Sequence, residues 1–334
     1  MARWVRGRLL LAAVVLTAAC SGPGGVTLGH DWDGASTFAL VRVDGLVTVV
    51  GINVREGRAE SLAVVPQQAD DSDVVSPHMV RLADGRWLVS VPRERGGADR
   101  RYLVNREDHV LDGVRGGEGL RRVLPGKTLV AEVAGLPGAG GVSSVLVKDP
   151  GDWTTRREVR VPGTIGFAAS DPAADSVCLG GEADVSVAQL GSGKVTRVAV
   201  GREVVGLACP AGRPVVVVAG AGSGAGSAAV GARVVRTDSA TTVSVSGGRV
   251  DAVAADGASI VVAVGVGNDT EVVEVDGRDG RELHRVRVEG FPASQDVVRT
   301  RDGWLVYAEE SVARVDLVDG RVRTFGLPGV LLDT

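Results

Sequence analysis

Short runs of apolar residues, rich in Val, alternate with polar turns along most of the chain. Examples are residues Phe38–Val43, Trp87–Val91, Pro214–Val218, Ile260–Val264 and Trp304–Tyr307. Runs of this length that are bounded by Gly, Pro and Asp are typical of β-strands. No persuasive amphipathic helical pattern of ten or more residues follows the N-terminal region, so the sequence predicts a nearly all-β fold.

The turns between these runs recur with a period of about 43 residues. One series contains Asp84-Gly85, Asp256-Gly257 and Asp302-Gly303, whose glycines are 172 and 46 residues apart. A second series of turns, from Gly57 to Gly320, spans 263 residues in six units. Asp-Gly and related pairs supply the positive φ angles that tight hairpins need. Two interleaved series therefore predict two hairpins, and so four antiparallel strands, in each unit.

A ring of such units explains why the period persists through the chain. Residues 27–330 divide into seven units of about 43 residues, which is the length of a propeller blade. Blades packed radially cover one another's faces, whereas an isolated four-stranded sheet cannot bury both of its faces. We therefore expect an all-β propeller with seven four-stranded blades over 27–330. Six blades would follow if the segment before Pro77 is not a blade, and a pair of β-sandwiches is the competing fold.

The closure of the ring and the end of the chain are predicted less directly. The first unit has three clear strands and an uncertain one around residues Thr27–Trp32, so this N-terminal segment is the expected closing element. The last unit contains four strands before Leu327, and residues 331–334 are therefore expected to form a C-terminal tail.

The segment Val272–His284 has an aliphatic strand followed by polar Gly-Arg turns, and it resembles a PQQ-type repeat. Over about 300 residues the chain is similar to bacterial extracytoplasmic propellers of the WD40-like, YVTN-like and PQQ-like groups. His284 stands where such repeats often carry a docking Trp. The resemblance implies the architecture and little about the chemistry.

The N-terminus has the pattern of an export signal. Residues 1–8 carry Arg3, Arg6 and Arg8, and an apolar run of eleven residues, Leu9–Ala19, follows. Eleven residues reach about 16 Å as a helix, which is shorter than the roughly 30 Å of a bilayer core.

Residues Leu16–Cys20 resemble the bacterial lipobox, with Thr17 where Leu is commoner. The resemblance implies that residues 1–19 are a lipoprotein signal peptide and that Cys20 is lipidated, with residues 20–26 as a flexible tether. The protein would then be anchored to the cell membrane by its lipid, on the extracytoplasmic face. An ordinary secretory signal, with Cys20 incidental, is the alternative.

The remaining cysteines, Cys178 and Cys209, form an even pair in a chain that carries an export signal. In an oxidising compartment such a pair predicts a disulfide, with two buried thiols as the alternative. A metal site is disfavoured because neither Cys has a nearby His or a CxxC partner.

Composition and motifs exclude several functions. The net charge is −4, and nucleic-acid binders usually carry a basic excess, so we expect no nucleic-acid partner. The glycine-rich segment Val215–Ala225 follows a strand, but too few residues remain for the helix of a dinucleotide site. Gly191–Lys194 lacks both ends of a phosphate-loop pattern. We therefore predict no cofactor and no catalytic residue, and interpret Gly220–Ala232 as a loop.

One group of polar residues is predicted to converge on the central channel. His78, Glu203, Asp251 and Asp296 each lie shortly before the first hairpin of a unit, with Arg121 nearby. They would begin the innermost strands and could bind a ligand at one mouth of the channel, although we predict no metal there. The expected function is a binding or protein-interaction module, and a protein is the expected partner. The alternatives are a hydrolase or lactonase that uses these carboxylates, and a structural envelope protein.

Overall fold

A computed structural model describes residues 26–66, 77–92, 99–116, 121–134, 142–182, 184–201, 204–218, 232–236, 242–245, 249–256, 259–276 and 281–334. These residues form seven four-stranded antiparallel sheets. The predicted signal peptide, Cys20, Glu203 and most of the Gly220–Ala232 loop lie outside them. Val26, the last residue of the predicted tether, is described and is buried in the domain.

Each sheet is a blade, and the blades are numbered here in chain order. Blade 1 contains β1 (Thr37–Val43), β2 (Leu46–Asn53), β3 (Arg58–Val64) and β28 (Val330–Asp333). Blade 2 contains β4 (His78–Arg81), β5 (Trp87–Val91), β6 (Arg100–Asn105) and β7 (Val110–Val114). Blade 3 contains β8 (Arg121–Pro125), β9 (Val130–Ala134), β10 (Val142–Lys148) and β11 (Thr155–Pro162). Blade 4 contains β12 (Phe167–Ser170), β13 (Ser176–Gly180), β14 (Asp184–Gln189) and β15 (Val195–Ala199).

The other three blades follow the same order. Blade 5 contains β16 (Val204–Ala208), β17 (Val215–Val218), β18 (Ala232–Arg236) and β19 (Thr242–Val245), with a short 3-10 turn at Pro210–Gly212. Blade 6 contains β20 (Arg249–Asp256), β21 (Ser259–Val266), β22 (Asp269–Asp276) and β23 (Glu282–Val288). Blade 7 contains β24 (Asp296–Thr300), β25 (Gly303–Tyr307), β26 (Ser311–Asp316) and β27 (Arg321–Gly326).

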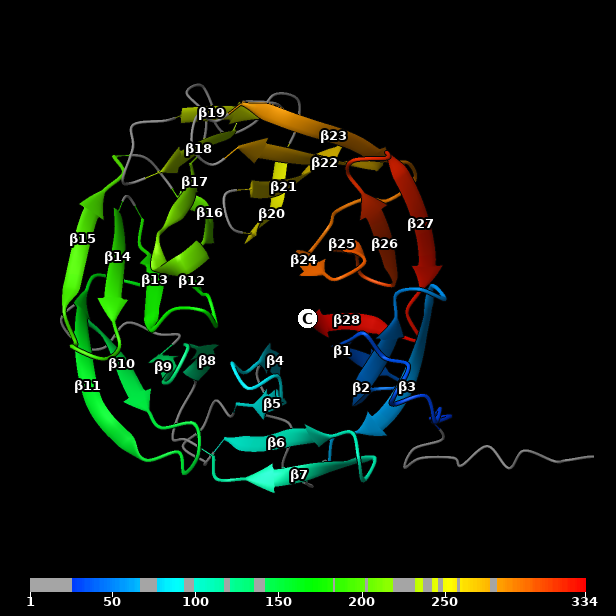
Figure 1. Ribbon diagram of the computed structural model, residues 1–334, viewed down its shortest axis with the longest axis horizontal. Helices are drawn as coiled ribbons and strands as arrows, with labels where there is room; N and C mark the ends of the chain where they lie inside the picture. Colours follow the sequence, from blue (N-terminus) through cyan, green and yellow to red (C-terminus); the bar gives the residue numbers. More distant parts are fainter. Residues whose placement is uncertain are drawn as a thin grey trace, which may run out of the picture.

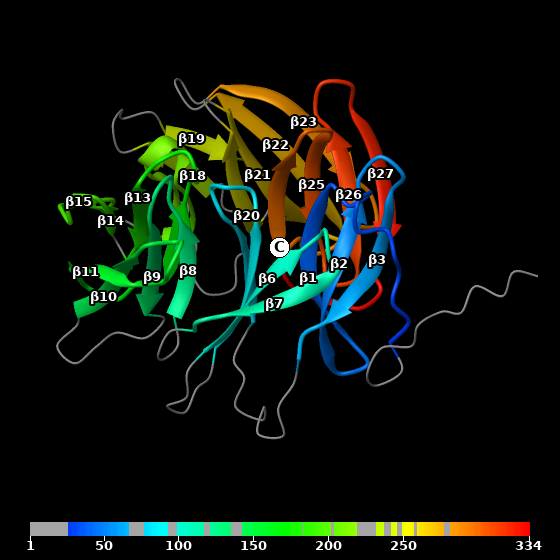
Figure 2. The same ribbon diagram turned by 60° about the horizontal axis from the view of Figure 1, so that its bottom comes forward.

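The sheets stand around a central axis. In Figure 1 the first strand of each blade from blade 2 onward lies toward the middle and the fourth lies at the rim; Figure 2 shows the same ring turned by 60°. The predicted all-β propeller of four-stranded blades is confirmed. Turn glycines have the predicted backbone geometry, since Gly85 and Gly193 have φ values of 87° and 75°.

The hydrophobic core lies between the blades. Each buried cluster joins two successive sheets: Phe38 of blade 1 packs with Met79 of blade 2, for example, and Leu305 of blade 7 packs with Val41 of blade 1. Aliphatic side chains on both faces of the middle strands are therefore removed from water. This explains why strands such as β13 and β21 are apolar along most of their length rather than alternating.

The ring closes through the C-terminal strand. β28 pairs with β1, with Leu331 opposite Val41, and it supplies the innermost strand of blade 1. The prediction of a tail over residues 331–334 is therefore wrong, as is closure by residues 27–32. The physical reason is that β1 would otherwise leave an unpaired edge at the channel, and Leu331 is buried in the cluster between blades 7 and 1.

A disulfide joins Cys178 of β13 to Cys209, which follows β16, and this is the pairing predicted from the sequence. It links blade 4 to blade 5. Within the described ranges, no helix has the length and hydropathy needed to cross a bilayer.

Candidate binding site in the channel

Two of the predicted channel residues lie in one polar group. His78 begins β4 and Asp296 begins β24, and both are within electrostatic range of Arg122 on β8. Asp333 on the closing strand β28 belongs to the same group, since its carboxyl interacts with both Arg122 and Asp296. His78 and Asp296 thus begin two innermost strands and share Arg122 as an electrostatic neighbour.

Backbone donors hold this group in place. The Val123 N–H donates to His78 Nε2 at 3.0 Å, so the imidazole ties blade 2 to blade 3. The Met79 N–H donates to Asp333 Oδ2 at 2.7 Å, and the Thr334 hydroxyl donates to Asp296 Oδ2. These contacts join the closing strand to its two neighbours, so the group has a structural role in the ring.

Burial favours the neutral forms of the titratable side chains in this group. Burial, together with Arg122 and Arg101, lowers the pKa of His78 to about 3, so its imidazole is neutral. Burial raises the pKa of Asp333 to about 7 against the opposing effect of Arg122, and burial also raises the pKa of Asp296. Near neutral pH the Asp333 carboxyl therefore carries only part of a negative charge.

Asp251 is not brought into this group. Asp251 sits at a bulge in β20 between Val250 and Ala252, and its Oδ1 accepts from Arg249 Nε at 2.6 Å. Its ion pair is therefore local to its own strand. Glu203 lies outside the described residues. Among the residues that are described, no cluster of three or more His, Cys, Asp or Glu side chains has an arrangement that could hold a metal ion.

A hollow lies further along the innermost strands. Its volume is about 640 Å³, and it is bordered by the last residues of β4, β8, β12 and β24, where the first hairpin of each blade begins. The sequence-based prediction placed the site at the starts of these strands and therefore did not include this cavity. The polar residues of the lining are Ser36, Thr37, Arg81, Arg122, Ser170, Arg299, Thr300, Arg301 and Thr334.

Four arginines from three blades give this cavity its chemistry. Arg299 is the one among them with a described partner, because its Nε lies 3.1 Å from Asp256 Oδ2 and its guanidinium lies 5.3 Å from the Trp304 ring centroid. The side chains of Arg81, Arg122 and Arg301 form no ion pair or hydrogen bond within the described part of the chain. The cavity therefore has a net positive lining.

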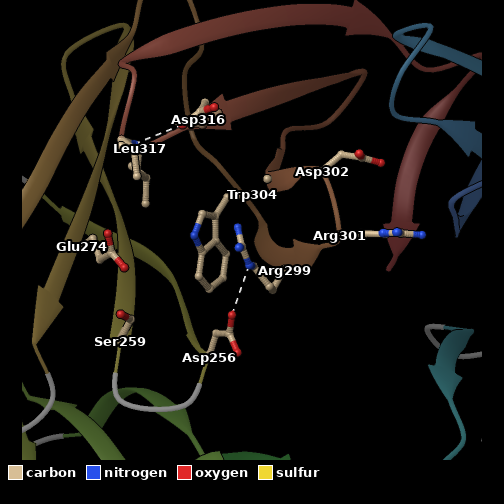
Figure 3. A pocket seen from close by; sticks show the side chains of 12 residues that line it. Asp256, Ser259, Glu274, Arg299, Arg301, Asp302, Trp304, Asp316 and Leu317 are labelled. Atoms are coloured by element: carbon tan, nitrogen blue, oxygen red, sulfur yellow. Dashed lines mark hydrogen bonds and ion pairs between the residues drawn. The ribbon is translucent and has the colours of Figure 1, made fainter.

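A second hollow of about 440 Å³ adjoins the first between blades 6 and 7, and Arg299 and Arg301 line both. Figure 3 shows Arg299 beside the Trp304 ring with its contact to Asp256, whereas Arg301 points away from the ring. Three of the four acidic side chains of this hollow have a basic neighbour: Asp256 has Arg299, Glu274 has His284, and Asp302 has Arg55. The fourth, Asp316, accepts from the backbone N–H groups of Val318 and Asp319 at 3.1 Å.

A periodic signal in the sequence identifies three of the four arginines. Arg81, Arg122 and Arg299 each stand four residues before the first hairpin glycine of their blade. Arg81 lies opposite Trp87, as Arg299 lies opposite Trp304. This arginine spacing is visible in the sequence, but the sequence-based prediction considered only the starts of the innermost strands.

Comparisons with known proteins support the fold. No protein-family model matches the chain, and no curated protein matches it. The structure is similar to apo AztD from Citrobacter koseri, with a TM-score of 0.56 and 11% identity over 89% of this chain and 96% of that one. It is also similar to hydrazine synthase from Kuenenia stuttgartiensis, with a TM-score of 0.53 and 12% identity over 89% of this chain and 96% of that one.

A further similar structure is the Pan2 WD40 domain from Neurospora crassa, with a TM-score of 0.50 and 10% identity over 80% of this chain and 90% of that one. At such identities the likeness concerns the architecture alone, and the proteins have different roles. Fold comparison and chain geometry therefore agree on one conclusion: this protein is a β-propeller with four-stranded blades.

Proposed function

We propose that this protein is a binding module whose ligand occupies the cavity at the hairpin end of the channel. The observation that carries the proposal is the hollow of about 640 Å³ lined by side chains from several blades. Sites for small ligands have volumes of roughly 300–1,000 Å³ and combine apolar walls with a few convergent polar groups. Met79, Trp87, Leu124 and Leu207 supply apolar surface here, beside the arginines.

The ring is a suitable scaffold for such a site. Buried clusters join each pair of successive blades, and the disulfide adds a covalent link between blades 4 and 5. Side chains on such a framework keep their relative positions, which lowers the entropic cost of binding. The hydrolase alternative has less support, because Asp251 is separate from the group that contains His78 and Asp296.

We also propose that the protein acts at the extracytoplasmic face of the cell membrane, anchored through Cys20. The support is the signal pattern over residues 1–19 and the Cys178–Cys209 disulfide, since disulfides persist in oxidising compartments. Mass spectrometry of the mature N-terminus tests this placement: a diacylglycerated Cys20 supports it, and an unmodified start at another residue contradicts it. A protein partner stays a prediction.

Blocking the cavity tests the binding function. Ser170 borders the hollow at the end of β12, so Ser170→Trp is expected to fill part of it, whereas Val110→Trp adds the same ring on an exposed strand of blade 2. Native mass spectrometry of protein purified from its own cells would detect a small molecule that copurifies. We expect Ser170→Trp to lose this molecule and Val110→Trp to keep it. Equal occupancy in both variants, with circular dichroism confirming folded protein, would contradict the proposal.

A further inference from the structure

We propose that the ligand of this cavity is a small, multiply charged oxyanion, bearing carboxylate or phosphate groups, that Arg81, Arg122 and Arg301 hold together. This inference rests on the proposed binding function and assigns its ligand class. The three side chains come from the inner parts of blades 2, 3 and 7, so a ligand that engages all of them must carry several acceptor oxygens. The planar guanidinium presents a fork of donors that matches carboxylate and phosphate oxygens.

The cavity arginines lack internal compensation. Elsewhere on the blades, some exposed arginines are paired with acids on neighbouring strands, as Arg197 is with Asp184 and Arg287 is with Asp269, and others, such as Arg160, stand on an exposed rim strand. At the cavity, three arginines border one hollow without a described partner of their own. Like charges around a concave, partly apolar surface repel one another and focus the electrostatic potential, and an external anion relieves this repulsion.

The described carboxyls that interact with Arg122 do not neutralise it through an ion pair. Asp296 and Asp333 interact with Arg122 electrostatically, yet neither forms an ion pair with it among the described contacts. Their acceptor atoms are used instead: Asp296 accepts from the Val297 N–H at 2.8 Å and from the Thr334 hydroxyl, and Asp333 accepts from the Met79 N–H. The carboxyls therefore serve the closure of the ring, and the Arg122 guanidinium is left for a ligand.

The adjoining hollow is poorly suited to a cation. Of its four acids, Asp256 and Asp302 form ion pairs with arginines, Glu274 contacts the His284 ring, and Asp316 accepts from the N–H groups of Val318 and Asp319. A cation would have to displace those partners, whereas an oxyanion at the cavity displaces none. Because these acids have partners within the protein and Arg81, Arg122 and Arg301 have no described partner, the expected ligand is an anion. This holds although the chain as a whole carries a net charge of −4.

Titration calorimetry with citrate and with inorganic pyrophosphate tests the inference on the wild-type protein at low salt. We expect at least one of them to bind, with affinity that falls as salt rises. Arg122→Gln and Arg301→Gln are each expected to weaken binding roughly tenfold or more, since a hydrogen bond to a charged group contributes about 1.5–3 kcal/mol. Arg160→Gln, on the exposed rim strand β11, makes the same change in net charge and should leave binding unchanged.

The outcomes separate this inference from the proposed function. If neither anion binds the wild type, or if Arg160→Gln weakens binding as much as Arg122→Gln does, the ligand class is wrong. The binding function would still stand if a copurifying molecule is lost from Ser170→Trp. If the anions bind but Ser170→Trp and the cavity arginine variants bind them as tightly as wild type, the cavity is not the site, and both proposals fail.

Discussion

Glu132 offers a direct test of how firmly the blades are joined. Its carboxylate lies on β9 of blade 3 and accepts from Arg101 Nη1 of blade 2 at 2.5 Å; Lys148 Nζ lies 3.2 Å from the same oxygen. The side chains of Arg101 and Glu132 are fully buried, and Arg101 also lies over the Trp153 ring. Glu132→Gln keeps the shape of this side chain and removes its charge.

The expected cost follows from burial. Without the Glu132 charge, two buried cations face one another, and Asp99, with Oδ2 3.8 Å from Arg101 Nη2, is the remaining nearby anion. Removing one partner of a buried ion pair typically costs about 3–5 kcal/mol, because the other charge stays uncompensated. For a propeller of about 300 residues, an unfolding entropy near 0.6 kcal/mol/K converts this to a fall in Tm of roughly 5–8 °C.

Differential scanning calorimetry at neutral pH measures the change. Glu158→Gln is a suitable control, because its carboxylate accepts from the Ser144 hydroxyl at 2.9 Å on the exposed face of blade 3. We expect the control to change the free energy of unfolding by less than about 0.5 kcal/mol. A Tm for Glu132→Gln that equals that of the control would refute the reasoning, since it would mean that water reaches the junction between blades 2 and 3.

Three further predictions concern the disulfide, the closing strand and pH. Replacing Cys178 and Cys209 together by Ser should lower the free energy of unfolding in urea by roughly 3–4 kcal/mol, because the bond closes a loop with a sequence separation of 31 residues; no loss would mean that the bond is absent in solution. Leu331→Ala should cost about 2–4 kcal/mol and speed hydrogen exchange of β1 amides, and unchanged exchange would argue against closure by β28. Because burial raises the pKa of Asp333 to about 7 from 3.8, folding takes up a proton, and wild type should lose stability relative to Asp333→Asn as pH rises from about 4 to 7. Urea unfolding at both ends of this range checks the sign, and a constant difference would contradict it.

Features encoded by local chemistry could be predicted from the sequence. Gly85 and Gly193 adopt the positive φ that their turns require, and their spacing reveals the repeating blades. The closing strand gave no such signal, because β28 is four residues long and its partner β1 lies at the other end of the chain. Its place depends on the open edge that the completed ring leaves, which is a property of the whole fold.

Only part of the candidate site could be predicted from the sequence. The register of the innermost strands placed His78 and Asp296 at the starts of two of these strands, where the structure also has them, at the beginning of β4 and of β24. Their charge could not be predicted, because burial makes His78 neutral and raises the pKa of Asp296. The positive lining arises from arginines of separate blades, such as Arg81 and Arg122, which meet only when the ring closes.

The most direct test of the account is a crystal structure of the protein with tungstate, an oxyanion that scatters anomalously. We expect an anomalous peak inside the channel cavity, within hydrogen-bond distance of the guanidinium groups of Arg81, Arg122 and Arg301, and no such peak in Arg122→Gln crystals. A cavity without tungstate in wild-type crystals, or a peak that Arg122→Gln leaves unchanged, would contradict the account.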